Sequence, residues 1–194
     1  MTKYHRKKRR ALSAVIICSV LAVLLAAAGI FGYSRFELYT HPIKYENFVE
    51  KYSRENDLDK YLVYAVIKTE SGFDPQAVSN VGARGLMQIM EPTFDWVKYR
   101  LGDEDSRYLD MYDPETNIRY GCWLIGYLCR EFGDADTAMA AYHAGSGQVG
   151  EWLEDADISA DGVHLDVIPI PDTAHYVSKI DRALATYKRL YGNQ

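Results

Sequence analysis

The sequence predicts a single mainly α-helical domain over residues 43–194, preceded by one N-terminal transmembrane helix. Three observations predict this fold class. A charge-free apolar run lies near the N-terminus, apolar residues recur at helical spacing from residue 45 onward, and Asp, Pro and Gly stand at the ends of those segments. The stretch between Gly72 and Gly85 is rich in turn-forming residues. It predicts a small irregular segment with a short strand pair inside the helical domain.

The first 42 residues have the composition of a membrane anchor. Residues 1–10 contain six Lys and Arg residues and no acid, and the 21 residues Ala11–Phe31 contain no charge. Such a run is long enough to cross the roughly 30 Å apolar core of a bilayer as a helix. Residues 32–42 then form a short tether. The basic flank favours the cytoplasmic side, so the chain from residue 32 onward is expected to face outward.

A cleaved signal peptide is the alternative interpretation of this segment. Ala26-Ala27-Ala28 offers the small residues of a cleavage site. The apolar region of a signal peptide is normally about 7–15 residues, however, which is shorter than the run found here. The sequence therefore favours a retained single-pass anchor, with the domain on the extracytoplasmic side.

The charge balance argues against nucleic acid as a partner. Of the 22 Lys and Arg residues, six lie in the first ten, which leaves 16 basic against 27 acidic residues in the remainder of the chain. An acidic domain offers no surface that could neutralise phosphates. A neutral ligand such as a sugar is easier to reconcile with the sixteen tyrosines.

The first two helices of the domain are predicted from their apolar faces. One face carries Tyr45, Phe48, Val49 and Tyr52. Asp57 or Asp59 is expected to cap the next helix, which ends near Glu70, because Gly72 and Pro75 stop it.

The later helices are predicted from the residues that begin them. Their starts are expected at Thr93, at Asp113-Pro114-Glu115, at Asp134 or Asp136, just before Val149, and at Asp172. Residues 155–171 read as a loop, and Gly192 follows the last helix. The pattern contains no long strand and no internal repeat.

Glu70 is the candidate catalytic residue. It follows the apolar segment 61–67, so its neighbours should desolvate its carboxylate, and the negative end of the helix dipole should oppose its charge. Both effects raise the pKa of a carboxyl group, which suits a general acid that works near neutral pH. The alternative interpretation is a polar residue that ends a helix at the surface.

Four segments together resemble a known family. ESGFDPQAVSNVGARGLMQIM, DPETNIRYG, AMAAYHAGSGQV and IPIPDTAHYVSKI occur in this order within residues 43–191. They are similar to the lytic transglycosylases of the soluble-lytic-transglycosylase (SLT) type, in the lysozyme-like superfamily close to goose-type lysozyme. The resemblance implies an α+β lysozyme-like fold. It also implies cleavage, without a cofactor, of the β-1,4 bond between N-acetylmuramic acid and N-acetylglucosamine in peptidoglycan glycan strands, leaving a 1,6-anhydromuramoyl end.

A single carboxyl group suffices for that chemistry. Hydrolytic glycosidases usually need two carboxylates, but here only Glu70 lies in an apolar, motif-dense setting. The substrate's 2-acetamido group can stabilise the cation at C1, and its C6 hydroxyl can replace water. Glu70 is then expected to donate a proton to the leaving oxygen and to accept one from that hydroxyl.

The resemblance also implies substrate-binding residues. Ser79 matches a serine that bonds the acetamido group, while Gln88 and Met90 match residues that line the glycan groove. Tyr142 and Tyr176 match tyrosines near the catalytic carboxyl, with core packing as the alternative role for Met90 and both tyrosines.

The chain departs from the family pattern at three positions. His143 stands where the family usually has Asn. It is expected to make the same orienting hydrogen bond, and a second acid–base role is the alternative. Asp172 replaces a customary Glu, and Glu91 adds a residue before Pro92.

Two rival functions remain. One is a hydrolytic muramidase with a second carboxylate at Asp74 or Asp95, and the other is a peptidoglycan-binding scaffold without catalysis. The five histidines are scattered, so no metal site is predicted. The residues identify no particular cell-wall or secretion machinery as a partner.

Overall fold

The computed structural model describes the backbone of residues 2–192 and the side chains of residues 19–192. The side chains of the predicted basic tail and of the first part of the predicted anchor, and the end of the predicted domain at residues 193–194, lie outside these residues. The chain divides into two compact units, Met1–Pro42 and Ile43–Gln194, and each is described by itself.

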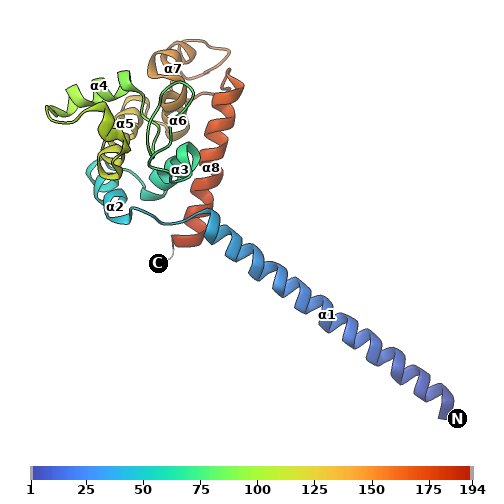
Figure 1. Cartoon of the computed structure of the whole chain (residues 1–194). Coiled ribbons are helices and arrows are strands. Elements are labelled where there is room, and N and C mark those ends of the chain that lie inside the picture. Colours follow the sequence, from blue (N-terminus) through green and yellow to red (C-terminus); the bar gives the residue numbers. More distant parts are fainter. Residues whose placement is uncertain (1, 193–194) are drawn as a thin grey trace. The chain divides into compact units, whose positions relative to one another are not determined.

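The first unit is one long helix, α1 (Thr2–Thr40), drawn in blue in Figure 1. The helix includes residues 32–40, so most of the expected tether at residues 32–42 is helical. Within the described residues, Ser19–Thr40 has a mean hydropathy of 1.6 and is long and apolar enough to cross a membrane. Its large apolar side chains are exposed, with Leu25 at 73%. By length and composition, this helix has the properties that a bilayer requires of a spanning segment.

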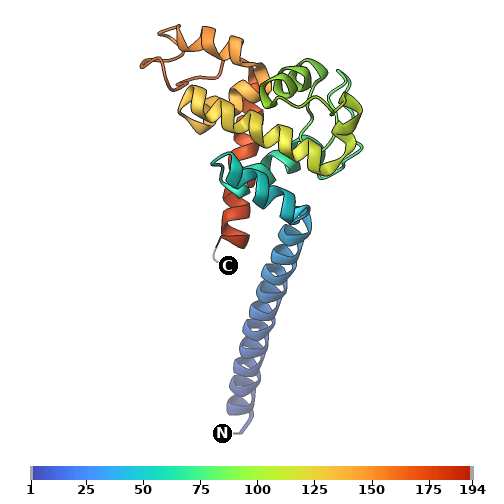
Figure 2. The ribbon, with the colours of Figure 1, turned by 90° about the vertical axis from the view of Figure 1, so that its left-hand side faces the viewer.

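The second unit is built from helices. Their order and bounds are α2 (Glu46–Glu55), α3 (Lys60–Ser71), α4 (Glu91–Leu101), the 3₁₀ helix η1 (Tyr108–Tyr112), α5 (Pro114–Phe132), α6 (Ala135–Ala144), α7 (Ser146–Leu153) and α8 (Pro171–Tyr191). The fold class is therefore mainly α, as predicted. The loop between α7 and α8 extends away from the helices (Figure 2).

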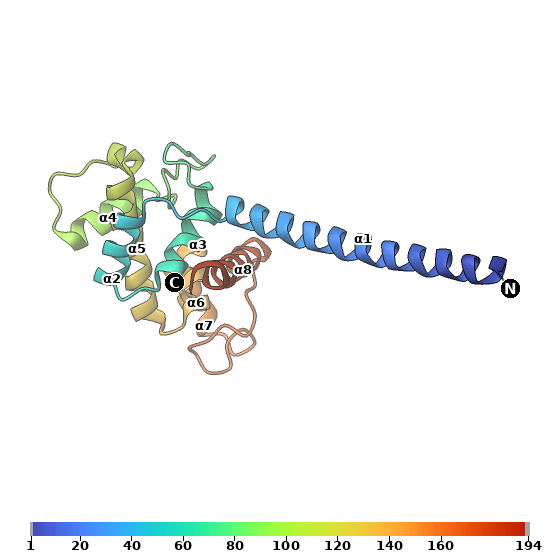
Figure 3. The ribbon, with the colours of Figure 1, turned by 90° about the horizontal axis from the view of Figure 1, so that it is seen from below.

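The core of this unit forms where α3 packs against α8, and where α5 packs between α2 and α6 (Figure 3). The apolar face of α3 is buried from Leu62 to Ile67, and α5 buries Ile118 and Ile125 completely. Removing this apolar surface from water is the main driving force for folding. The packing of α3 against α8 also fixes the end of α3, where Glu70 lies.

The segment between α3 and α4 is irregular. Isolated antiparallel bridges pair Val78 with Arg84 and Arg84 with Ile89, and no sheet forms in the part of the chain that the structure describes. The irregular segment is therefore as the turn-forming residues predict, but the expected strand pair is reduced to these single bridges.

The helix ends test the predicted caps. Of the two alternatives Asp57 and Asp59, it is Asp59 that accepts a backbone N–H bond at the start of α3. Of Asp134 and Asp136, it is Asp134 that does so at the start of α6. The cap predicted at Thr93 is wrong, because α4 already begins at Glu91 with Pro92 in its first turn. The cap predicted at Asp172 is also wrong, since α8 begins at Pro171. In both helices a proline supplies the first turn and the preceding residue is extended.

Candidate active site

Glu70 lies one residue before the end of α3. The helix ends there because Gly72 adopts the left-handed conformation, with φ 60°, which a residue with a side chain adopts at a cost. Ser71 donates its hydroxyl to the backbone oxygen of Leu86 over 2.8 Å. The end of α3 is thereby joined to the irregular segment, and Glu70 is held at their junction.

The carboxyl group of Glu70 is bonded to a residue from the other end of the domain. Tyr176, on α8, donates its hydroxyl to Oε1 of Glu70 over 2.8 Å. Burial raises the pKa of Glu70 to about 7, and the Tyr176 hydrogen bond opposes this rise by stabilising the carboxylate. No acidic side chain contributes to the rise. The carboxyl group is therefore poised between its two protonation states near neutral pH.

Tyr142, on α6, belongs to the same group of side chains. It donates its hydroxyl to the backbone oxygen of Met87 over 2.7 Å. Burial, followed by the charge of Glu70, raises its pKa well above the ordinary value, and the same two causes act on Tyr176. Both tyrosines thus remain neutral hydrogen-bond donors beside Glu70.

His143 lies at the edge of this group. Its ring centroid is 4.7 Å from that of Tyr176, and its Nδ1 is 3.1 Å from the hydroxyl oxygen of Thr173. Partial burial lowers the pKa of His143. The structure thus brings together four of the predicted site residues, Glu70, Tyr142, His143 and Tyr176, and adds Thr173 as the partner of the histidine.

Ser79 and Gln88 lie on the irregular segment and shape it. The Ser79 hydroxyl oxygen accepts the N–H groups of Val81 and Ala83, at 3.3 and 3.0 Å. Gln88 has a positive φ of 48°, and its side-chain nitrogen donates to the backbone oxygens of Ala77 and Gly85. The Ser79 hydroxyl proton and the Gln88 side-chain oxygen are the groups that these bonds leave for a ligand.

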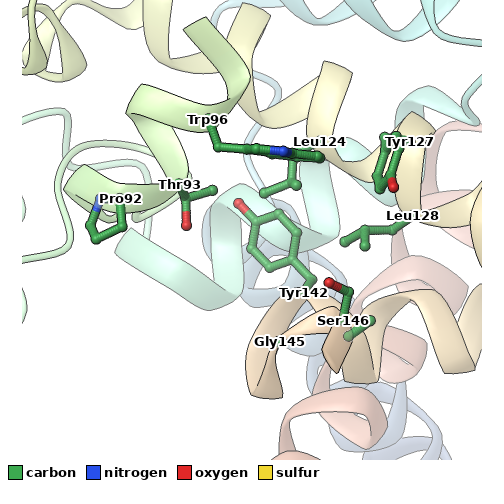
Figure 4. A pocket seen from close by; sticks show the side chains of 10 residues that line it. Pro92, Thr93, Trp96, Leu124, Tyr127, Leu128, Tyr142, Gly145 and Ser146 are labelled. Atoms are coloured by element: carbon green, nitrogen blue, oxygen red, sulfur yellow. The ribbon is translucent and has the colours of Figure 1, made fainter. Parts of the chain in front are cut away.

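Met90 precedes α4 and is 41% exposed. Just beyond it lies a recess with a volume of about 370 Å³ between α4, α5, α6 and the start of α7 (Figure 4). Tyr142 forms part of its lining. Figure 4 shows the indole of Trp96 along one side of the recess, with Tyr142 beside it and Ser146 at the opposite side.

Sequence reasoning missed the residue that organises the turn before Gln88. Asn117, on α5, is fully buried and accepts the N–H of Met87 at 2.8 Å. It donates to the backbone oxygens of Arg84 and Met111, at 3.0 and 2.8 Å. The signal in the sequence was an amide at a position where the helical period of α5 calls for an apolar residue.

Neither alternative carboxylate joins the Glu70 group. Asp74 accepts the backbone N–H of Gln76 in an exposed turn, and Asp95 is an exposed residue of α4. No group of three or more His, Cys, Asp and Glu side chains in the described region is arranged to hold a metal ion. The chemistry that this arrangement can perform is proton transfer by one buried carboxyl group.

Comparison with known proteins places this site in a family. Residues 47–163 match the family described as the transglycosylase SLT domain. The soluble lytic murein transglycosylase of Salmonella typhimurium is 33% identical over 156 residues, which cover 79% of this chain and 24% of that protein. The chain is therefore far shorter than this relative.

Two solved structures share the fold. The 70 kDa soluble lytic transglycosylase of Escherichia coli superposes with a TM-score of 0.71 at 29% identity, covering 80% of this chain and 26% of that one. An inactive Slt variant from Pseudomonas aeruginosa, with a glutamate changed to glutamine, superposes with a TM-score of 0.67 at 26% identity, covering 77% and 24%. The matched residues, the helical architecture and the motifs around Glu70 agree, and the chain belongs to the transglycosylase SLT domain family.

Proposed function

We propose that this chain is a membrane-anchored peptidoglycan lytic transglycosylase with Glu70 as its single general acid and base. It cleaves the β-1,4 bond between N-acetylmuramic acid and N-acetylglucosamine and leaves a 1,6-anhydromuramoyl end. The observation that carries this proposal is the Glu70 carboxyl group, whose pKa is raised by burial to about 7 and whose hydrogen-bond partner is a tyrosine rather than a second acid.

The reaction has two proton transfers. Protonated Glu70 donates its proton to the glycosidic oxygen while the bond from C1 to that oxygen breaks, and the 2-acetamido group of the muramic acid stabilises the positive charge at C1. The Glu70 carboxylate then accepts the proton of the C6 hydroxyl as O6 bonds to C1. Glu70 returns to its protonated state and no water is consumed.

The neighbours of Glu70 support each step. Tyr176 stabilises the carboxylate formed by the first transfer, and its own pKa is far too high for it to lose its proton. The free proton of Ser79 and the free oxygen of Gln88 suit the acetamido and hydroxyl groups of the sugar. Met90 offers an exposed thioether against which a sugar ring can pack.

The relatives support the same assignment. The Salmonella relative is named a soluble lytic murein transglycosylase, and the Pseudomonas structure is of an inactive variant with glutamate changed to glutamine. The apolar helix Ser19–Thr40, preceded by the basic residues 3–10, supports a single-pass anchor with the SLT unit on the extracytoplasmic side.

The test is incubation of the purified chain with cell-wall sacculi, followed by mass spectrometry of the released muropeptides. Products should carry anhydro ends, which are lighter than hydrolysed ends by one water. Glu70→Gln should release no product while it keeps the helical circular dichroism spectrum. Hydrolysed ends would make the protein a muramidase, and binding without any release would make it a scaffold.

A further inference from the structure

His143 is a titratable side chain of the Glu70 group that the proposed reaction does not use. Its ring lies tilted against the ring of Tyr176, with the centroids 4.7 Å apart and the planes at 33°. Tyr176 in turn donates its hydroxyl to Glu70 over 2.8 Å. A change in the state of His143 therefore reaches the catalytic carboxyl group through one intervening side chain.

Thr173 fixes the other edge of the His143 ring. Nδ1 of His143 lies 3.1 Å from the Thr173 hydroxyl oxygen. Thr173 is only 1% exposed, and among the described contacts its hydroxyl has no other hydrogen-bond partner. A buried hydroxyl proton without an acceptor costs free energy. The Thr173 hydroxyl is therefore the donor and Nδ1 the acceptor, which places the proton of the neutral imidazole on Nε2.

Protonation of His143 is incompatible with this arrangement. The added proton occupies Nδ1, so Nδ1 no longer accepts the Thr173 hydroxyl, and the buried hydroxyl proton loses its acceptor. This penalty acts in the same direction as partial burial, which lowers the pKa of His143, while the charge of Asp172 opposes the effect of burial. The hydrogen bond and the stacking on Tyr176 therefore both belong to the neutral form of the histidine.

The charged groups around His143 do not compensate a positive charge on its ring. On α8, Asp172 acts on it from an exposed position. On α3, Glu70 lies beyond Tyr176 and is already protonated below about pH 7. On α6, the neighbouring Tyr142 keeps its proton, and α5 and α7 contribute no described charge to the pKa of His143. A charge that appears on His143 in acid is therefore largely uncompensated.

The consequence for the reaction follows from the position of this charge. It opposes the positive charge that develops at C1 of the substrate, and it weakens the Glu70 carboxylate as the base of the second proton transfer. Loss of the Thr173 bond also releases the ring that packs against Tyr176. Each of these effects slows turnover.

We infer that His143 is a positioning residue that seats Tyr176 on Glu70 only while its imidazole is neutral, so that its protonation slows the enzyme in acid. This inference rests on the proposed function for the reaction that is slowed. A mechanism with Glu70 alone predicts a rate that stays constant as the pH falls below 7, because Glu70 then remains protonated. A fall in rate on the acid side is therefore the signature of His143.

The first experiment measures kcat/KM of the full-length chain on solubilised glycan strands between pH 4.5 and 8. The wild type should lose about tenfold per pH unit once His143 is protonated. His143→Asn keeps a hydrogen-bond acceptor that does not titrate, so it should stay within about threefold of wild type at pH 7 and lose the acid fall. Thr173→Val removes the donor and should move the acid fall to higher pH. His175→Asn, at an exposed position of α8, is the matched control and should keep the wild-type profile.

A second experiment needs no turnover. In full-length Glu70→Gln in detergent micelles, NMR of labelled histidine would follow the His143 ring through the same pH range. Its midpoint should lie below the ordinary pKa of 6.5, and Thr173→Val should raise that midpoint. The ring resonances of Tyr176 should shift with the same midpoint, because the two rings are in contact. This measurement keeps His143 itself in place, so it stands if His143→Asn fails to fold.

The outcomes separate the inference from the proposed function. An acid fall that persists unchanged in His143→Asn would overturn the inference, as would a wild type without any acid fall. The same His143 midpoint in Thr173→Val and its parent would also overturn it. If the chain releases hydrolysed ends or no product, the proposed function fails, and a Tyr176 shift that follows the His143 midpoint still supports the positioning role.

Discussion

Glu70 owes its chemical character to its place at the end of a packed helix. Burial alone accounts for the rise of its pKa to about 7, and Tyr176 partly offsets it. A carboxyl group with an ordinary pKa near 4.5 would be almost fully ionised at neutral pH and could not act as an acid. The opposing effects of burial and hydrogen bonding therefore set the pH range in which the site can work.

The first prediction concerns the pH dependence of turnover. The first step needs protonated Glu70, so kcat/KM should fall as the pH rises through about 7. Tyr176→Phe removes the hydrogen bond that stabilises the carboxylate, so it should move this fall to higher pH and lower kcat roughly tenfold. Turnover of sacculi by each protein between pH 5 and 9 measures both effects. An unchanged midpoint in Tyr176→Phe would refute the role given to this bond.

The second prediction concerns the stability of Glu70→Gln. Because the folded-state pKa of Glu70 is raised above its unfolded value, its protonation stabilises the fold fully below pH 4.5, and this contribution is lost as the pH rises to about 7. Glutamine carries no charge, so Glu70→Gln should be more stable than wild type above pH 7, by about 1–3 kcal/mol. The two proteins should converge near pH 4. Urea unfolding at both pH values measures the difference, and Glu104→Gln, in an exposed loop, is a control that should show little change.

At the scale of elements, local signals predicted the helices better than their exact starts. Asp113 caps α5 as expected, because cap, proline and acid all lie within three consecutive residues. The start of α4 was misplaced at Thr93, since the sequence does not show whether an extended Met90 or the later threonine ends the preceding turn. The residue at which α4 begins depends on the conformation of the preceding loop, and Asn117 of α5 fixes that loop through its hydrogen bond with the N–H of Met87.

The candidate site also contains a part that the local sequence predicts and a part that only the packing of helices determines. Glu70 could be found from sequence because the apolar run before it is local. Its bond to Tyr176 joins residues 106 positions apart, and it depends on α3 packing against α8. The spacing of apolar residues along the sequence does not show which residue of α8 will lie beside Glu70. The resemblance supplied Tyr176 as a candidate, and the packing supplied its partner.

The irregular segment is fixed by a close approach as well as by hydrogen bonds. Gly85 has φ 75°, and a Cβ at this position would overlap the Met111 backbone oxygen and the Asn117 side chain. Gly82 has a similar φ of 88°, but a Cβ there would meet no atom within 4 Å. A substitution at Gly82 therefore tests backbone strain alone, whereas one at Gly85 tests backbone strain together with steric overlap.

The third prediction uses this pair. Gly82→Ala should cost about 1–2 kcal/mol, from the left-handed backbone alone. Gly85→Ala should cost roughly 3 kcal/mol or more, because Asn117 must also move. It should lower activity on sacculi further than Gly82→Ala does, since Asn117 holds the turn before Gln88. Equal losses of stability and activity in the two variants would show that the overlap is relieved without disturbing the turn.

At the scale of the whole molecule, the charges are segregated along the chain. Six basic residues lie in the first ten, and the rest of the chain carries an excess of acids. The SLT unit has its own core of buried apolar residues, formed within residues 49–187. The buried core and the apolar helix that serves as the proposed anchor therefore lie in different parts of the sequence.

The fourth prediction separates these two parts. Deletion of residues 1–42 should leave a soluble protein with unchanged kcat on purified sacculi, because every side chain placed around Glu70 belongs to the second unit. The full-length chain should remain in the membrane pellet after carbonate extraction, and protease added outside the membrane should degrade the SLT unit. N-terminal sequencing of the mature protein distinguishes an anchor from a signal peptide. A new terminus after Ala28 would show that the apolar segment is removed and that the enzyme acts without an anchor.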